Sequence, residues 1–160
     1  MQVDERTFRK ALGCFASGVT VATTCDAAKR PVGVTVSAFS SVSLDPPLVL
    51  FCLDKRASGA AAFREGHFAI NILQEGQRQV SIQFASRLDD KWQGVAHEVN
   101  AHGVPLIGDA LARLECAVHR VVDGGDHDII IGRVEAIDYQ TGGQPLLYFR
   151  GAYANISECF

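Results

Sequence analysis

Two long runs rich in β-branched residues constrain the fold of this chain more than any other feature. They span Leu114–Val122 and Asp128–Tyr139, and Asp123-Gly124-Gly125-Asp126-His127 joins them. Glycine beside aspartate is the turn chemistry typical of β-hairpins, because these residues tolerate the positive φ values that tight turns require. The pattern predicts an antiparallel hairpin and hence an antiparallel sheet.

Strand patterns also dominate the rest of the chain, and helical patterns are brief. Further strands are expected at Val19–Thr24, Pro31–Phe39, Leu48–Leu53, His67–Leu73 and Leu146–Phe149, and short helices at 4–15, Ser58–Phe63 and Glu75–Ala85. Asp45-Pro46-Pro47 is expected to be a connection, and residues 86–110 to be irregular apart from an apolar patch at 104–107. Six or more closely spaced strands predict a mainly β fold, a β-barrel with short helices, rather than a doubly wound sheet.

The composition fits one soluble domain spanning residues 1–160. Of the 160 residues 48% are hydrophobic, and the net charge of -3 offers no basic footprint for nucleic acid or an anionic membrane surface. The five cysteines are scattered and form no C-x-x-C pair, so neither a disulfide framework nor a zinc site is expected. The polar N-terminus lacks the apolar core of a signal peptide, and a cytoplasmic protein is expected.

Motifs of several enzyme classes are missing from the sequence. It contains no G-x-G-x-x-G, no phosphate-binding P-loop, no H-E-x-x-H and no G-x-S-x-G. A nicotinamide or flavin cofactor would therefore be bound without a Rossmann fold. The five histidines are too dispersed in sequence to indicate a metal cluster, and no metal is expected.

Two segments with polar residues at a strand end could bind a ligand. Thr35–Ser43 holds four serines within seven positions, and its hydroxyls could satisfy local backbone groups or meet the carbonyl or phosphate oxygens of a ligand. Cys52–Ser58 ends a strand, and Lys55, Arg56 and Ser58 then offer charge and donors to a phosphate. For this second segment, considered alone, a solvated turn is the favoured explanation, because Lys-Arg after a strand is more often exposed to water.

Two later segments allow both a structural and a functional interpretation. In Gly124–His127 the histidine could be a surface side chain of a turn, or it could reach into a cleft and hydrogen-bond a carboxamide. Pro145–Gly151 could be a core strand, with Tyr148 and Arg150 either structural or ligand-facing.

Taken together in order, these segments resemble the flavin reductase-like domain family, small reductase components of two-component flavin-dependent monooxygenases. The matching stretches are FASGVTVATT (15–24), VGVTVSAFSSVSLDPPLVLFCLDKRAS (32–58), FAINIL (68–73), SIQFASR (81–87), GDALARLEC (108–116), GGDHDIIIGRVEAI (124–137) and PLLYFRGAY (145–153). The resemblance covers nearly the whole chain. It implies the FMN-binding split barrel, a six-stranded antiparallel Greek-key barrel, usually as a homodimer.

The resemblance also implies which residues would form the site. The flavin ring would lie against Ser37, Ala38, Phe39 and Ser40, and its phosphate end would meet Cys52, Leu53, Asp54, Lys55, Arg56, Ala57 and Ser58, with Ala85 and Ser86 as further contacts. The nicotinamide would involve the Ala16-Ser17-Gly18 turn, Ser43, His127, Tyr148 and Arg150. His127 is the candidate for positioning the nicotinamide and for supplying the proton that accompanies hydride.

The implied activity is hydride transfer from NADH or NADPH to FMN or FAD. Such a reaction requires stacking, orientation and exclusion of water, while the cofactors carry the chemistry. The family often treats flavin as a substrate that leaves reduced for a separate oxygenase. The alternatives are a flavin-binding electron carrier of the same fold, an enzyme like pyridoxamine-phosphate oxidase, and a structural module without a ligand.

Overall fold

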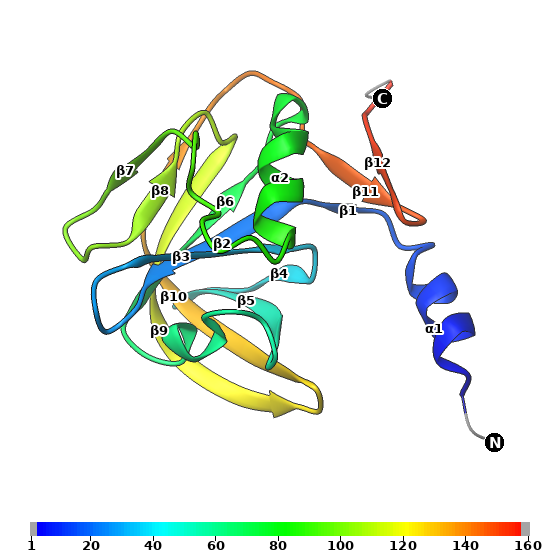
Figure 1. The fold of residues 1–160 in the computed structure, drawn as a ribbon, viewed down its shortest axis with the longest axis horizontal. Coiled ribbons are helices and arrows are strands. Elements are labelled where there is room, and N and C mark those ends of the chain that lie inside the picture. The colour runs from blue at the N-terminus through cyan, green and yellow to red at the C-terminus, as the bar shows by residue number, and fades with distance from the viewer. Residues whose placement is uncertain (1–2, 158–160) are drawn as a thin grey trace.

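The computed structural model describes residues 3–157, and a curled seven-stranded antiparallel sheet forms its centre (Figure 1). In spatial order the strands are β3 (Pro31–Val36), β2 (Thr20–Cys25), β6 (His67–Ile72), β9 (Ala112–Gly124), β10 (His127–Tyr139), β5 (Pro47–Asp54) and β4 (Phe39–Leu44). The predicted hairpin of β9 and β10 is confirmed, and so is the mainly β class. The wider resemblance to a split barrel agrees with this sheet.

The two outer strands of this sheet, β3 and β4, are consecutive in the chain. The strand expected over Pro31–Phe39 is in fact broken, because the backbone bends at Ser37 and Ala38 and Phe39 begins a new strand. Among residues 3–157 no ladder of hydrogen bonds links β3 to β4, so the curled sheet is not closed by pairing. The bend at Ser37 and Ala38 is the covalent connection between the two edge strands.

Three phenylalanines fill the main core inside the sheet. The ring of Phe51 meets Phe63 edge-on at 5.7 Å and Phe68 at 5.2 Å between centroids, and all three are fully buried. Edge-to-face contact suits the quadrupoles of the rings. Gly132 on β10 lies directly against this cluster, and a Cβ there would overlap the Phe68 ring. The core is therefore packed so tightly that position 132 has no space for a side-chain methyl group.

Three short helices pack against the sheet in two separate clusters: the first contributes Phe63 to the main core, and the third contributes Phe84 to a second cluster with Val21 and Leu73. They are the 3₁₀ turn η1 (Ala60–Phe63), the 3₁₀ turn η2 (Glu75–Gln77) and the α-helix α2 (Arg78–Ala85). The helix expected over Glu75–Ala85 is present as η2 followed by α2. Thr35 Oγ1 donates to the Ser81 carbonyl at 2.6 Å and so ties β3 to α2. Phe84 packs edge-on against Trp92 and lies within 2.5 Å of where a Cβ on Gly33 would be.

The expectation of an irregular segment over 86–110 is wrong in part. β7 (His97–Val99) and β8 (Pro105–Ile107) form a two-stranded hairpin, which local sequence does not indicate because its support is distant. Buried Asn71 on β6 provides that support: its side-chain carbonyl accepts from the Ile107 amide at 2.9 Å, and its amide donates to the Val21 carbonyl at 2.9 Å. A buried amide with both ends satisfied fixes three strands relative to one another.

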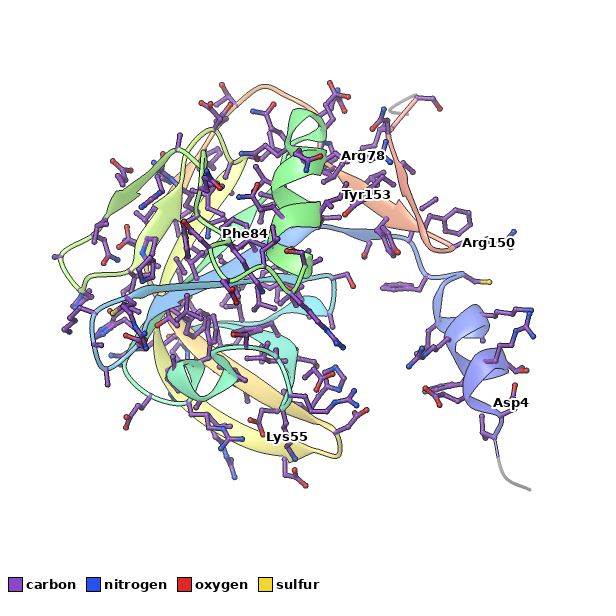
Figure 2. All side chains as sticks on the ribbon, in the orientation of Figure 1. Asp4, Lys55, Arg78, Phe84, Arg150 and Tyr153 are labelled. Atoms are coloured by element: carbon purple, nitrogen blue, oxygen red, sulfur yellow. The ribbon has the colours of Figure 1, made fainter. Side chains whose placement is uncertain are left out.

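The N-terminal helix stands apart from the rest of the molecule. It is α1 (Glu5–Leu12), it begins with an Asp4 cap, and none of its eight residues is buried. A small sheet of β1 (Ser17–Gly18), β11 (Leu147–Phe149) and β12 (Ala152–Ala154) lies between α1 and the main body (Figure 1). Tyr153 on β12 anchors this sheet, because its hydroxyl lies 2.8 Å from Ser81 Oγ and its ring lies beneath Arg78 (Figure 2).

Within residues 3–157 no helix combines the length and apolar character that crossing a bilayer requires. Cys14, Cys25, Cys52 and Cys116 are free thiols, and Cys159 lies outside the described residues.

Replacement of Gly132 by alanine is expected to lower the free energy of unfolding by about 1–3 kcal/mol, because overpacking forces rotamer and backbone shifts. Gly76→Ala is the matched control, since nothing lies within 4 Å of a Cβ at that position. Urea titration followed by circular dichroism measures both variants. Equal stabilities for the two variants would contradict the tight packing described for Phe68.

Candidate functional site

A small cleft opens where the bend between β3 and β4 meets the end of β5 and the start of β10. We call it the strand-end cleft. Its volume is about 200 Å³, and it is lined by Val34, Thr35, Val36, Ser37, Ala38, Cys52, Leu53, Asp54, Ala57 and His127. The structure therefore brings together residues from the serine-rich segment, the Cys52–Ser58 segment and the GGDH turn, which the sequence treats as three separate segments.

The strand ladder sets the positions of these residues. His127 is paired with Asp54 in the antiparallel register of β10 and β5. The Cys52 amide donates to the Ala38 carbonyl at 3.0 Å, which holds the bend against β5. Phe39 then pairs with Phe51 at the start of β4. Because backbone pairing rather than flexible side chains forms the walls, the cleft has a defined shape.

His127 is oriented by its neighbour in the chain. Its Nδ1 lies 2.7 Å from Asp126 Oδ1, and the imidazole is 40% exposed at the rim of the cleft. This hydrogen bond from His127, together with its charge, lowers the pKa of the Asp126 carboxyl. With Nδ1 bonded to a carboxylate, Nε2 remains for a ligand or a proton.

Lys55 and Arg56, which the sequence analysis assigns to a phosphate, are both paired with carboxylates. Lys55 Nζ donates to Asp123 and to the Gly125 carbonyl, the latter at 2.6 Å, and so ties β5 to the β9–β10 turn. Arg56 donates from Nε and Nη2 to the two oxygens of Asp54, at 3.1 and 3.0 Å. A phosphate would have to share these cations with, or take them from, the carboxylates.

The Asp54 carboxylate is strongly stabilised in its ionised form. The side-chain hydrogen bond from Arg56 lowers the pKa of Asp54 from 3.8 to about 2, with smaller contributions from the Arg56 amide, the Arg56 charge and His127. Beside it, desolvation raises the pKa of the Cys52 thiol. The raised pKa disfavours the thiolate, the form in which a cysteine acts as a nucleophile.

A second hollow of about 470 Å³ adjoins the Ala57–Ser58 segment, and we call it the Trp92 hollow. It is lined by Asp26, Arg30, Pro31, Val32, Gly33, Ser58, Gly59, Leu88, Asp89, Asp90, Lys91 and Trp92. Ala57 lines the strand-end cleft while Ser58 lines this hollow, so the two spaces flank one turn. Trp92 Nε1 donates to the Pro31 carbonyl at 3.2 Å and fixes the far wall.

One sequence expectation changes at this turn. The expected helix over Ser58–Phe63 is only the four-residue 3₁₀ turn η1, whose N-cap position is occupied by Gly59 with a φ of 78°. Ala85 ends α2, and the Ser86 hydroxyl donates to the Gln83 carbonyl at 2.6 Å. Neither Ala85 nor Ser86 is among the residues that line the two spaces, although the segment that follows them lines the Trp92 hollow.

The residues expected near a nicotinamide fall into two groups. Ser17 pairs with Tyr148, and Gly18 with Leu147, in the small sheet, whereas His127 lies in the strand-end cleft. Ser43 lies on β4, paired with Leu48 of β5. The structure thus joins the Ser17–Gly18 turn to the Tyr148 strand and places His127 and Ser43 on the main sheet.

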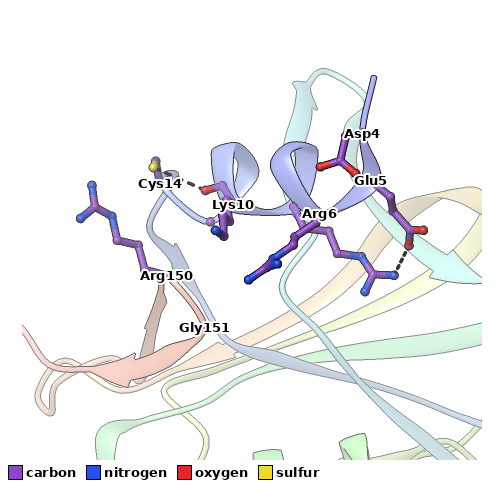
Figure 3. Close-up of a pocket in the computed structure, with 9 residues that line it drawn as sticks. Asp4, Glu5, Arg6, Lys10, Cys14, Arg150 and Gly151 are labelled. Atoms are coloured by element: carbon purple, nitrogen blue, oxygen red, sulfur yellow. Dashed lines mark hydrogen bonds and ion pairs between the residues drawn. The ribbon is translucent and has the colours of Figure 1, made fainter. Parts of the chain in front are cut away.

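A hollow of about 840 Å³ lies beside α1 and shares no lining residue with the strand-end cleft. Arg6, Lys10, Cys14 and Arg150 surround it, with an ion pair of 2.6 Å between Arg9 and Glu5 (Figure 3). Arg150 adopts a left-handed φ of 48° in the β11–β12 turn, and its guanidinium lies 5.0 Å from the centre of the Phe149 ring. Because an unpacked helix forms one wall, size alone does not make this hollow the functional site.

Sequence reasoning missed several residues of the site. Val34 lines the strand-end cleft and was not predicted, although it lies directly before the serine-rich segment Thr35–Ser43, whose residues Thr35 and Val36 also line the cleft. Trp92 and Lys91 of the Trp92 hollow lie in a segment without a recognisable pattern. At about 200 Å³ the cleft is smaller than the 300–1,000 Å³ usual for ligand sites, so it suits one edge of a ring system whose remainder extends outside.

Comparison with known proteins shows which family the chain resembles. Residues 12–157 match the family described as Flavin reductase like domain. The stachydrine N-demethylase reductase subunit Stc3 of Rhizobium meliloti is 44% identical over 151 residues, which is 94% of this chain and 65% of that protein. The HsaB reductase subunit of a flavin-dependent monooxygenase from Rhodococcus jostii is 41% identical over 155 residues, which is 96% of this chain and 79% of that protein.

Among solved structures, the NADH:FAD oxidoreductase SgcE6 of Streptomyces globisporus in complex with NAD and FAD fragments superposes with a TM-score of 0.91. It is 35% identical, and the match covers 98% of this chain and 97% of that one. The chain spans 48% and 65% of the length of two relatives from Rhizobium meliloti.

The Asp54 carboxyl is expected to titrate at about pH 2, as measured by carbon NMR of the side chain. Since a lowered pKa in the folded state stabilises the ionised form, the Arg56–Asp54 pair contributes stability above pH 4, and this contribution is lost as the pH falls through about 2.

Arg56→Gln is expected to move the Asp54 midpoint back toward 3.8, because its main cause is removed. Lys55→Gln is the matched control, since that ammonium pairs with Asp123 and should affect the pKa of Asp123 instead. An unchanged Asp54 midpoint in Arg56→Gln would contradict the assigned cause.

Proposed function

The chain belongs to the Flavin reductase like domain family, and on that basis we propose that it is a flavin reductase that passes hydride from NADH or NADPH to FMN or FAD. One observation carries the proposal. The bend at Ser37–Ala38, the end of β5 and His127 line a single cleft with backbone-defined walls. These are the segments through which the chain resembles the family, and they come together without a Rossmann fold.

In the proposed complex the flavin ring edge enters the strand-end cleft. Ser37, Ala38 and the start of β4 at Phe39 and Ser40 offer backbone groups and hydroxyls along one wall, and Cys52 and Leu53 offer an apolar opposite wall. Bound flavin supplies the hydride acceptor, and the nicotinamide supplies the donor. The chain's own task is to hold the two rings in contact and exclude water.

The polar end of the flavin is proposed to follow the Asp54–Ser58 turn toward the Trp92 hollow. Lys55 and Arg56 lie at this turn, and phosphate oxygens can take the places of their partners, the exposed Asp123 and the half-buried Asp54. The hollow of about 470 Å³ has room for further parts of a larger flavin. FMN and FAD both remain compatible with this path.

His127 is proposed to position the nicotinamide carboxamide or to move a proton at Nε2. Its Nδ1 bond to Asp126 at 2.7 Å fixes the ring orientation, as an orienting carboxylate does for other catalytic histidines. The small sheet and its β11–β12 turn carry the other residues expected at the nicotinamide, Ser17, Gly18, Tyr148 and Arg150. They would contact the nicotinamide from the small sheet and not from the strand-end cleft. Ser43 would approach from β4.

Reduced flavin is proposed to leave and serve a separate oxygenase chain. HsaB and Stc3, which this chain resembles over 94% or more of its length, are by name reductase subunits of a monooxygenase and a demethylase. An open cleft of about 200 Å³ with an exposed rim favours exchange of flavin over permanent retention. Because NADH and NADPH are cytoplasmic reductants and the described cysteines are free, a cytoplasmic location is part of the proposal.

A homodimer is proposed because the apolar face of α1 is more than half exposed. Phe8, Leu12 and Phe15 are 53%, 57% and 83% exposed, and they follow one stripe of the helix and its end. Contiguous exposed apolar surface of this kind marks protein contacts. A second copy of the chain would cover the stripe and fill the hollow between α1 and the β11–β12 turn.

NADH oxidation by the purified chain is expected to increase strongly on addition of FMN or FAD, as followed by nicotinamide absorbance. His127→Ala should lower kcat/KM for the nicotinamide by about 10²-fold or more, the usual cost of losing a general acid–base group. His119→Ala is the control, because His119 is exposed on β9 outside the cleft. If flavin binds but does not stimulate NADH oxidation, the reductase proposal is wrong and a flavin-binding electron carrier of the same fold is favoured.

Phe15→Glu is expected to convert the dimer to monomer in sedimentation velocity, because a buried unpaired carboxylate is costly. Val99→Glu is the control, since Val99 is 61% exposed on β7, on the side of the molecule remote from α1 (Figure 1). A wild-type chain that sediments as a monomer, or a dimer that survives Phe15→Glu, would contradict the proposed interface.

A further inference from the structure

Two histidines and a glutamate from distant parts of the chain converge on the side of the sheet near the β7–β8 hairpin. His67 begins β6, His102 lies in the β7–β8 turn, and Glu135 lies on β10. Their potential ligand atoms all lie within 4.8 Å of one another. The imidazole rings are stacked at 3.7 Å between centroids with 9° between planes, and His67 Nε2 lies 3.5 Å from Glu135 Oε2. The dispersed positions of the five histidines in the sequence did not indicate a metal cluster, but two of them lie together here.

The backbone holds each of the three residues in place. Glu135 is the extra residue of a β-bulge, between the pairs Val134–Cys116 and Ala136–Glu115. Bulges redirect a side chain and are common beside functional sites. The His67 carbonyl accepts from the Thr24 hydroxyl at 2.7 Å. The convergence is therefore a consequence of the main-chain fold and not of long, mobile side chains.

The turn that carries His102 is also fixed. The Asn100 side-chain carbonyl accepts from the backbone amides of His102 and Val104, at 2.9 and 3.0 Å, and its amide donates to Glu115 Oε2 at 2.5 Å. The imidazole itself is exposed, so it can rotate on this fixed turn. Rotation matters because two parallel rings cannot both direct an in-plane lone pair at one ion.

We propose that His67, His102 and Glu135 bind one divalent transition-metal ion of the zinc class, with His102 rotating out of the stack to do so. Two imidazoles and one carboxylate are a usual ligand set for Zn²⁺, and solvent completes the tetrahedron in sites with three protein ligands. Without the ion, the stacked rings and the carboxylate share a small space. With the ion, its charge compensates Glu135.

A hollow open to solvent adjoins the cluster. This hollow of about 490 Å³ gives the ion access from solvent, and Asp26, Glu65 and Lys29 are among its lining residues. Arg133 Nη2 lies 3.4 Å from Glu135 Oε1, which leaves the other carboxylate oxygen toward His67. Asp26 is occupied by Arg30 at 2.8 Å.

The ion would act on the fold and not on hydride transfer. Glu135 follows His127 by eight residues along β10, a distance of about 26 Å in an extended strand. An ion that binds only the folded chain stabilises it by mass action. Bound at His102, it would fasten the β7–β8 turn to β6 and β10.

The test uses the full chain without a histidine tag, with Zn²⁺ added after chelator treatment. Calorimetric titration is expected to show one saturable site. The midpoint temperature of thermal unfolding should rise by about 5–10 °C when free Zn²⁺ is about 100-fold above its Kd. His102→Ala should weaken binding by more than about 10-fold, since even outer-shell changes at metal sites cost that much. Glu135→Gln should weaken it as well.

His119→Ala is the matched control and should bind Zn²⁺ like the wild type, because His119 lies outside the cluster. Cys25→Ser separates the proposal from a thiol site, since the Cys25 thiol lies 4.0 Å from the His102 carbonyl oxygen. The proposal is overturned if no saturable binding occurs, if His102→Ala binds as tightly as the wild type, or if only Cys25→Ser abolishes binding. His102 is exposed, so its replacement is expected to leave the fold intact.

Discussion

The register between β5 and β10 is the constraint on which the rest of the molecule depends. It pairs Ile130 with Phe51 in the core and, three residues earlier on β10, His127 with Asp54 at the cleft. Since side chains alternate across a strand, a slip of one residue would turn Phe51 and Leu53 out of the core and remove His127 from the cleft. The hydrophobic core and the proposed site are therefore specified by the same ladder.

The bend at Ser37–Ala38 converts this ladder into a cleft. It connects the two outer strands of the curled sheet, and the Cys52 amide holds it against β5. Ser37 and Ala38 are small, so the chain can turn here while its backbone stays close to any bound ring. A site built from strand ends and small side chains suits a reaction in which the bound cofactors carry the chemistry and the protein supplies orientation.

Features that depend on local chemistry could be predicted from the sequence. The β9–β10 hairpin follows from its Asp-Gly-Gly turn. A helix over Glu75–Ala85 was also predicted, although its apolar residues Val80, Ile82 and Phe84 do not follow a helical period. The β7–β8 hairpin could not be predicted, because buried Asn71, 36 residues before Ile107, supports it. For the same reason nothing in the spacing of His67 and His102 indicates that their rings stack.

The candidate site was predictable in its segments but not in its geometry. The ordered resemblance to a family selected the serine-rich bend, the Cys52–Ser58 turn and His127. Only the structure shows that Lys55 and Arg56 are held by Asp123 and Asp54, and that the Ser17–Tyr148 pair belongs to a separate small sheet. Such pairings depend on which strands become neighbours, a property of the whole fold.

The central claim is that flavin binds in the strand-end cleft, and a crystal structure of the complex with oxidised FMN or FAD tests it most directly. The account predicts the ring edge against Ser37 and Ala38, with the phosphate end along the Asp54–Ser58 turn. A flavin ring seated instead in the hollow between α1 and the β11–β12 turn, away from His127, would contradict it.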